Sequence, residues 1–206
     1  MNKNKPQNHR ISLENVYTKK VGATNLAIRE VNLPEDIEII YRWTQLAYAK
    51  KFWAEDRSLR DLYSFYHSVI NNCCLQLFFV TIDRHPAALV EVYPVQCAEE
   101  ALQNAYEVRV GDYGIHLLLS PHRELLSLAS NLSKKNISVF LLQFILEFMF
   151  NLFSVQRILA EPDVNNTNAG KLANRAGFVF QRIIQLSNKV AALYIITRQD
   201  LAKAVK

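Results

Sequence analysis

The spacing of apolar and polar residues divides the chain into short strands and amphipathic helices. Alternating or continuous β-rich runs predict strands, and apolar residues three and four positions apart predict helices. Strands are predicted over residues 26–31, 75–82, 88–93, 115–119, 156–160, 179–186 and 190–197, and helices over residues 34–43, 54–72, 132–153 and 166–176. Pro34 suits the first turn of its helix, and Gly177 suits the end of the last helix.

The most apolar stretch of the chain covers residues 137–153. It includes the polar residues Gln143 and Glu147, and it is short for the roughly 20 residues that span a bilayer. We therefore predict a helix that is buried on most sides in a globular core rather than a membrane span.

The order of these elements, β-α-α-β-β-β-α-β-α-β-β, predicts one α/β domain with a mixed sheet over residues 26–206. A strand that leads into a helix places the N-terminus of that helix at the edge of the sheet, where its unpaired N–H groups attract phosphate. The pattern suits a phosphate-bearing cofactor, but many α/β folds share it.

Composition and charge narrow the classes of partner. Half of the 206 residues are apolar, which is enough for a substantial core. The formal charge of +5 is concentrated in residues 1–25, where five Lys or Arg residues face a single Glu, and we expect this segment to be a flexible basic leader without a secretory signal. The rest of the chain is nearly neutral and lacks the basic surface that binds nucleic acid.

The cysteines indicate the compartment. Cys73, Cys74 and Cys97 show neither a disulfide framework nor metal-ligand spacing, and three free thiols suit the reducing cytoplasm. No other cluster of His, Cys, Asp and Glu has the spacing of a metal site, so we predict no metal.

One motif links the chain to a known fold. Residues 166–178 read Asn-x-x-Ala-x-x-Leu-x-x-x-x-Gly-Phe and resemble the fourth-helix signature of GNAT acetyltransferases. The predicted order of elements agrees with that fold from about residue 26 to residue 197. The resemblance implies a central mixed sheet flanked by helices and an acyl-CoA, such as acetyl-CoA, as the co-substrate.

Two further motifs resemble a narrower branch of that family. Residues 111–119 read Gly-Asp-Tyr-Gly-Ile-His-Leu-Leu-Leu, and residues 161–166 read Glu-Pro-Asp-Val-Asn-Asn. Both are similar to siderophore-biosynthesis enzymes of the aerobactin and alcaligin type, as are residues 189–193 and the pair Phe52 and Trp53. That branch acylates N6-hydroxylysine or an N-hydroxydiamine. The resemblance therefore implies a small hydroxylated amine as substrate and a siderophore synthetase as a possible partner.

The same resemblance suggests which residues act in catalysis. Acyl transfer needs an acceptor for the proton of the nucleophile, and the pKa of histidine lies near neutrality. By resemblance, His116 is the general base and Asp163 orients it or grips the substrate. Each has a structural alternative, since His116 could be a satisfied core histidine and Asp163 a cap for the following helix.

The cofactor is expected between the strands that end near Leu119 and Glu161. Family members usually hold the pyrophosphate with a glycine-rich loop before the long helix, but residues 120–130 contain no glycine. Ala173 stands where many relatives have a Tyr that protonates the leaving thiolate. Cofactor contacts are predicted for Leu118, Leu119, Arg123, Lys134, Lys135, Asn166 and Asn174, with an N-cap role as the alternative for Asn166.

The acceptor region is less defined by the sequence. Trp43, Phe52 and Trp53 are predicted to wall a slot for an aliphatic amine, and core packing is the alternative. Three hypotheses for the whole chain follow. It acylates a hydroxylamine of a siderophore precursor, it acetylates another small amine, or it is a degenerate GNAT domain that acts as a binding module.

Overall fold

The computed structural model describes residues 17–53, 57–71, 75–129, 132, 136–151 and 154–205. Its strands are β1 (Tyr17–Val21), β2 (Thr24–Glu30), β3 (Gln76–Ile82), β4 (His85–Pro94), β5 (Asp112–Leu119), β6 (Arg157–Ala160), β7 (Val179–Gln185) and β8 (Val190–Thr197). Its helices are α1 (Leu33–Thr44), α2 (Ala47–Phe52), α3 (Leu59–Asn71), the 3-10 turn η1 (Val95–Cys97), α4 (Glu100–Asn104), α5 (His122–Leu128), α6 (Ile137–Asn151), α7 (Thr167–Ala176) and α8 (Arg198–Ala204).

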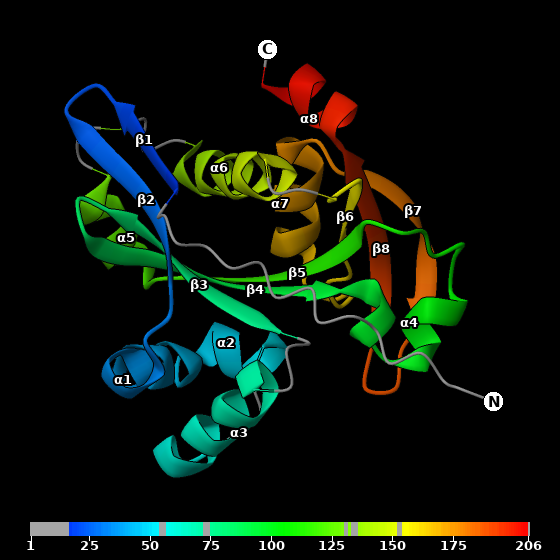
Figure 1. Ribbon diagram of the computed structural model, residues 1–206, viewed down its shortest axis with the longest axis horizontal. Helices are drawn as coiled ribbons and strands as arrows, with labels where there is room; N and C mark the ends of the chain where they lie inside the picture. Colours follow the sequence, from blue (N-terminus) through cyan, green and yellow to red (C-terminus); the bar gives the residue numbers. More distant parts are fainter. Residues whose placement is uncertain are drawn as a thin grey trace.

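All eight strands belong to one mixed sheet in the order β1-β2-β3-β4-β5-β6-β8-β7. Every neighbouring pair is antiparallel except β5 and β6, which run parallel. Helices α1, α2 and α3 cover one face of the sheet, and α6 and α7 cover the other (Figure 1). The predicted α/β class and mixed sheet are thus confirmed.

The side chains of the central strands point alternately to the two faces of the sheet and contribute to two hydrophobic cores. In β3, Phe78 and Val80 belong to the core beneath α6, whereas Leu77 and Phe79 belong to the core beneath α1 and α3. Successive side chains of a strand point to opposite faces, so a continuous apolar run is required where helices cover both faces. The same alternation decides where Glu91 of β4 points. Glu91 is two residues from Leu89, so both side chains lie on the face toward α1 and α3.

The apolar helix α6 is packed inside the protein, as predicted. Nine of its residues, from Ile137 to Phe150, are buried, and it contacts α7 and α8. Within the part of the chain that the structure describes, no helix is long and apolar enough to cross a membrane.

The predicted leader boundary at residue 25 needs correction. Residues Tyr17–Val21 form β1, which pairs with β2 and places Tyr17 against Phe144 and Phe148 of α6. Lys19 of this strand forms an ion pair with Glu147 of the same helix. The segment was expected to be a leader because its apolar side chains are few, and a strand at the edge of the sheet needs few of them. Residues 1–16 lie outside the described part.

Other differences concern short elements. The structure has helices α2, α4, α5 and α8, which the apolar spacing did not predict. Each has five to seven residues, too few for a helical period to stand out. One of them, α5, occupies most of the glycine-free segment 120–130. The remaining predicted strands and helices are present, with ends that differ by a few residues.

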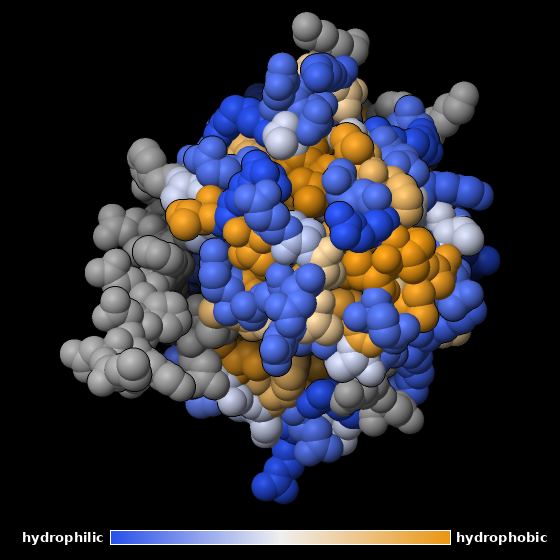
Figure 2. All heavy atoms as spheres, turned by 90° about the vertical axis from the view of Figure 1, so that its right-hand side faces the viewer, coloured by the Kyte–Doolittle hydropathy of each residue, from blue (hydrophilic) through white to orange (hydrophobic). Residues whose placement is uncertain are grey.

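Strand β7 forms one edge of the sheet and carries exposed apolar side chains. Val179, Phe180 and Ile183 are about half exposed. Apolar patches are visible on this side of the molecule (Figure 2).

A buried ion pair fixes the start of the parallel pair β5 and β6. Asp112 is fully buried at the first residue of β5, and Arg157, at the first residue of β6, donates two hydrogen bonds of 2.7 and 2.6 Å to it. The same carboxylate accepts hydrogen bonds from the hydroxyl of Tyr106 and the backbone N–H of Arg109. The aspartate of the Gly-Asp-Tyr-Gly-Ile-His motif is therefore a structural clamp between β5 and β6.

We predict that Asp112→Ala lowers the free energy of unfolding by about 3–5 kcal/mol, because it leaves the partly buried Arg157 without its counter-charge. Urea denaturation measures the loss. Arg42→Ala is the control, since Arg42 is mostly exposed and 3.8 Å from its partner Glu124, and its cost should stay within about 1 kcal/mol. Equal losses in the two variants would contradict a clamp at Asp112.

Candidate active site

The pocket lies where β5 and β6 separate. The two strands pair only over Asp112–Gly114 and Arg157–Leu159. Beyond that point β5 stays with β4, while the chain after β6 follows β8 through the bridge from Asp163 to Ala191. The separation opens a cavity of about 540 Å³ that is lined by both strands, the starts of α6 and α7, and the end of α2.

His116 lies in this pocket between two carboxylates. Its register partner across the β4–β5 ladder is Glu91, and the Glu91 Oε2 atom is 2.8 Å from His116 Nδ1. On the other side, the Glu161 Oε1 atom is 2.8 Å from His116 Nε2. The side chains of Glu91 and Glu161 are 12% and 4% exposed, whereas that of His116 is 39% exposed toward the pocket.

Two tyrosines extend the network. The hydroxyl of Tyr66, from α3, donates to Glu91 Oε1 at 2.9 Å, and the hydroxyl of Tyr93, from β4, donates to Glu161 Oε1 at 2.9 Å. Burial first, and then the adjacent carboxylate, raises the pKa of each phenol well above its usual value. Both hydroxyls therefore stay protonated and act as hydrogen-bond donors.

Gly114 makes room for Tyr93. The two residues are opposite each other in the β4–β5 ladder, and a Cβ at position 114 would lie 2.1 Å from the Tyr93 ring. The absence of a side chain at Gly114 lets the ring cross β5 and bring its hydroxyl to Glu161. The second glycine of the motif is therefore required by packing in the site.

The two carboxylates decide the protonation of His116. Burial alone lowers the pKa of His116, but the charges and hydrogen bonds of Glu161 and Glu91 outweigh it and raise the pKa to about 10. Burial raises the pKa of Glu161, but the charges of His116 and Lys189 and the hydroxyl of Tyr93 outweigh it and leave the pKa below its ordinary value. At neutral pH the imidazolium is thus the cation of the network and has no lone pair to act as a base.

The aromatic residues predicted to wall the acceptor slot divide into two groups. Phe52 and Trp53 line the pocket, and the Trp53 ring meets that of His116 edge to face at 5.9 Å. Trp43 does not line it. It is completely buried and packs edge to face on Phe79, so the alternative of core packing holds for Trp43. Its position on the inner side of α1 faces the sheet, which the sequence spacing could not separate from a position facing a ligand.

Comparison with known proteins identifies the family. A family model described as an acetyltransferase (GNAT) domain matches residues 32–186, which is most of the chain and includes His116 and the two carboxylates that hold it. The chain belongs to the GNAT acetyltransferase family. It is an N-acetyltransferase that uses acetyl-CoA as its donor.

Individual relatives agree with this assignment. N-hydroxyputrescine acetyltransferase from Acinetobacter baumannii is 23% identical over 188 residues, which cover 91% of this chain and 85% of the relative. The structure of an uncharacterized protein from Bacillus halodurans matches with a TM-score of 0.80 and 22% identity, over 92% of this chain and 93% of the other. An aminoglycoside acetyltransferase in complex with coenzyme A matches with a TM-score of 0.74 and 20% identity, over 88% and 99% of the two chains.

The GNAT assignment gives the predicted cofactor residues a context. Leu118 and Leu119 line the pocket at the end of β5, and Asn166 lines it at the start of α7. Asn166 also caps that helix, because its Oδ1 accepts a hydrogen bond from the backbone N–H of Ala169. Both interpretations of Asn166 are therefore compatible with its place. Asn174 is exposed and is not among the pocket residues, whereas its neighbour Arg175 is.

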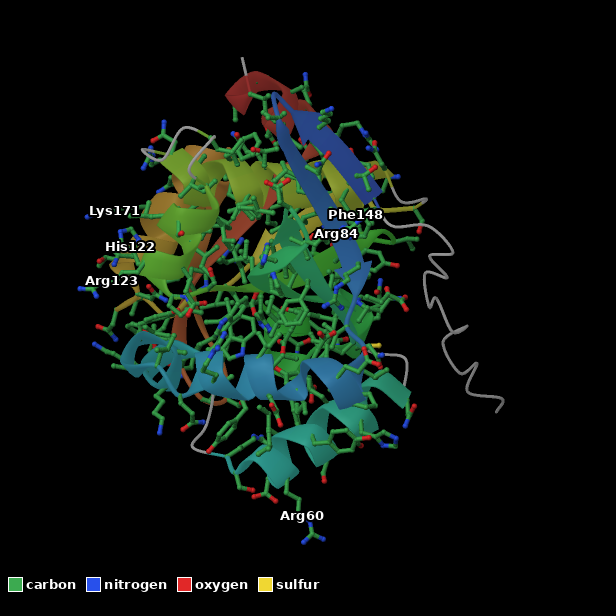
Figure 3. The ribbon with its side chains drawn as sticks, turned by 90° about the vertical axis from the view of Figure 1, so that its left-hand side faces the viewer. Arg60, Arg84, His122, Arg123, Phe148 and Lys171 are labelled. Carbon is green, nitrogen blue, oxygen red and sulfur yellow. The ribbon has the colours of Figure 1, made fainter. Side chains whose placement is uncertain are left out.

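Basic side chains gather at the mouth of the pocket. Lys171 from α7 and His122 from α5 line it, and Arg123 projects from the same edge of the molecule (Figure 3). Arg175 donates to Asn136, which precedes α6 and also lines the pocket. Lys134 and Lys135 lie outside the described residues. The cation pair from α7 was missed by the sequence analysis because Lys171 and Arg175, four residues apart on a helix, look like an ordinary solvated face.

Asp163 does not take the orienting role that was predicted for it. It lines the pocket, but its Oδ1 accepts the backbone N–H of Asn165 at 2.7 Å, and the carboxylates that hold His116 are Glu91 and Glu161. A turn at Asp163 directs the chain from β6 into α7, which explains the local hydrogen bond. Gripping the substrate remains a prediction for Asp163.

Glu91 was not among the predicted site residues, although one feature of the sequence indicates it. Glu91 is a single acidic residue inside the apolar strand β4, and an unpaired charge there would cost several kcal/mol. Such a residue indicates a buried partner. Which partner it meets depends on the pairing of β4 with β5, which the sequence pattern did not specify. Among the described residues, no group of three His, Cys, Asp or Glu side chains is arranged to hold a metal ion.

We predict that Gly114→Ala lowers the free energy of unfolding by about 1–3 kcal/mol, because the new Cβ overlaps the Tyr93 ring. Chemical denaturation measures the loss. In the background of Tyr93→Ala, the same glycine substitution should cost much less, since the ring it meets is gone. Additive losses in the double variant would show that the two residues do not compete for the same space.

Proposed function

We propose that this GNAT acetyltransferase transfers an acetyl group from acetyl-CoA to the nitrogen of a small hydroxylated amine in siderophore assembly. The observation that carries the proposal is the ring of His116, held between Glu91 and Glu161 in the wall of the pocket, because these carboxylates favour its protonated form. A primary amine is an ammonium ion at neutral pH, and it must lose a proton before it can attack. The oxygen of a hydroxylamine lowers the basicity of the adjacent nitrogen, so this nucleophile enters neutral and is not repelled by the imidazolium.

The similarity to N-hydroxyputrescine acetyltransferase supports the same substrate class, since it extends over 91% of the chain. Beside His116, the rings of Phe52 and Trp53 offer an apolar wall for the methylene chain of such a substrate. The nearby carboxylate of Asp163 could bind the ammonium group at the other end of a hydroxylated diamine.

The donor would occupy the gap between β5 and β6. In this proposal, the acetyl thioester lies beside His116, and the pantetheine arm follows Leu118 and Leu119 at the splayed end of β5. The phosphates lie at the start of α6, where Asn136, Ile137 and Ser138 line the pocket and where a helix N-terminus favours an anion. The positive charges of Lys171 and Arg175 then bind the phosphates, a role that a glycine-rich loop fulfils with its backbone N–H groups.

The substrate proposal is tested by measuring CoA release with N-hydroxyputrescine, N-hydroxycadaverine and N6-hydroxylysine, each beside its parent amine without the hydroxyl group. We expect kcat/KM to be higher for the hydroxylated member of a pair by about 100-fold or more. The absence of CoA release with all three hydroxylamines, from protein that still binds acetyl-CoA, would exclude this substrate class. A preference for a parent amine would favour the alternative of another small-amine acetyltransferase.

The cofactor proposal predicts that the double variant Lys171→Ala/Arg175→Ala raises the KM for acetyl-CoA about tenfold, which corresponds to about 1.4 kcal/mol, with little change in kcat. The effect should shrink when the donor is acetyl-pantetheine, which lacks the nucleotide phosphates. Arg182→Ala on β7 is a matched control, since Arg182 is exposed on a different element. A KM that is unchanged in the double variant would place the phosphates elsewhere.

A further inference from the structure

The two oxygens of Glu161 have different surroundings. Oε1 is 2.8 Å from His116 Nε2, accepts the hydroxyl of Tyr93 at 2.9 Å, and lies 4.0 Å from Lys189 Nζ. Oε2 is buried and has no hydrogen-bond partner among the described residues. A buried carboxylate oxygen without a donor is costly, and in a native protein such an atom calls for an explanation. Because Glu161 lines the pocket, a ligand that displaces the side chains covering this atom can supply the missing donor.

We propose that Glu161 is the catalytic base of this acetyltransferase, with Oε2 accepting the proton of the attacking nitrogen, and that His116 and Glu91 are positioning residues that keep Glu161 ionised. This assignment moves the base from the histidine, where the sequence motif places it, to the carboxylate beside it. It rests on the acetyl transfer that the family assignment establishes, and it does not require the acceptor to be a hydroxylamine.

Charge alternates along the line of three side chains. Glu91 and Glu161 are negative, and the imidazolium between them is positive and donates one N–H to each. Both ring nitrogens of His116 are therefore occupied, and neither offers a lone pair to a substrate. Glu91 is held in turn by the hydroxyl of Tyr66. Each group in the chain fixes its neighbour, and only Glu161 retains a free acceptor atom.

The charged and hydroxyl groups around His116 come from several elements. Strand β4 supplies Glu91 and Tyr93, the segment after β6 supplies Glu161, and the turn before β8 supplies Lys189. Helix α3 contributes Tyr66 through Glu91, while the ring of Trp53, at the end of α2, adds no charge. Asp163 lines the same pocket on the side of β8.

The chemical step balances without another co-reactant. The amine nitrogen attacks the carbonyl carbon of acetyl-CoA, so that a C–N bond forms and the nitrogen becomes cationic. Its proton passes to Glu161 Oε2, the C–S bond breaks, and the proton then passes from Glu161 to the departing sulfur, which leaves as a thiol. A thiol has a pKa of about 8.5, so transfer to the thiolate from a carboxyl group is downhill. The same carboxylate thus replaces the Tyr that is absent at Ala173.

The decisive experiment compares pH profiles of kcat/KM for Glu161→Gln and His116→Gln, with whichever amine gives the highest rate of CoA release. Glu161→Gln should lose about 10²–10⁴-fold at every pH, since the base is gone. His116→Gln removes the cation, and burial then raises the pKa of Glu161. Its rate should fall at neutral pH and recover toward that of the wild type as the pH rises. His85→Gln, at the exposed first residue of β4, is the control and should follow the wild type.

If His116 is the base, His116→Gln will show a loss that alkaline pH does not repair, and the proposal fails. Glu91→Gln gives an independent test, because it lowers the pKa of His116. A base at His116 would then be more often deprotonated at neutral pH, and the rate would rise. We expect no such rise. The acid limb of the kcat/KM profile should move to higher pH in Glu91→Gln, but by less than it does in His116→Gln. A uniform loss with no shift of the acid limb would reduce Glu91 to a structural residue and contradict its positioning role.

One measurement requires no acceptor and therefore separates this proposal from the choice of substrate. ¹⁵N NMR of the imidazole in the wild-type protein should show His116 protonated through neutral pH, with a pKa near the value of about 10 that its two carboxylates impose. An imidazole that is neutral at pH 7 would overturn the proposal, whatever amine the enzyme acetylates.

Discussion

Two carboxylates that flank one imidazole at 2.8 Å can both stay ionised only if that imidazole carries a proton. This constraint organises the site. It makes His116 a fixed cation, it leaves Glu161 as an anion despite burial, and it requires Tyr66 and Tyr93 to be neutral donors. Through the hydrogen bond from Tyr66 to Glu91, the network also joins helix α3 to the sheet beside the pocket.

The sheet provides the space in which this network operates. Asp112 and Arg157 hold β5 and β6 together at their first residues, and beyond Gly114 the strands follow different neighbours. A sheet with one parallel pair between antiparallel ladders can part at that pair, because each of the two strands remains bonded on its other side. The cavity is therefore a consequence of strand order, and the ends of both strands supply its walls.

Much of the fold was predictable from the sequence. The predictions that were wrong concern single short elements. The β-rich runs and helical spacings located the central strands and the buried α6, because their apolar side chains are numerous and regular. The strand at Tyr17–Val21 was mistaken for part of a leader, since an edge strand shows little apolar pattern. The glycine-free segment was expected to be a loop, but most of it is the helix α5, which is too short to reveal a period.

In the site, local sequence motifs indicated single residues, whereas the tertiary structure decided which of them are in contact. The resemblance of the motifs pointed to His116, to the two strands between which the cofactor was expected, and to the helix that begins after Asn166, because these depend on residues that are adjacent along the chain. Which carboxylates meet His116 was decided only by the folded sheet. Glu91 reaches it through the register of β4 on β5, and Glu161 reaches it across the gap between β5 and β6. Pairing over 25 and 45 residues depends on strand order, which no local pattern encodes.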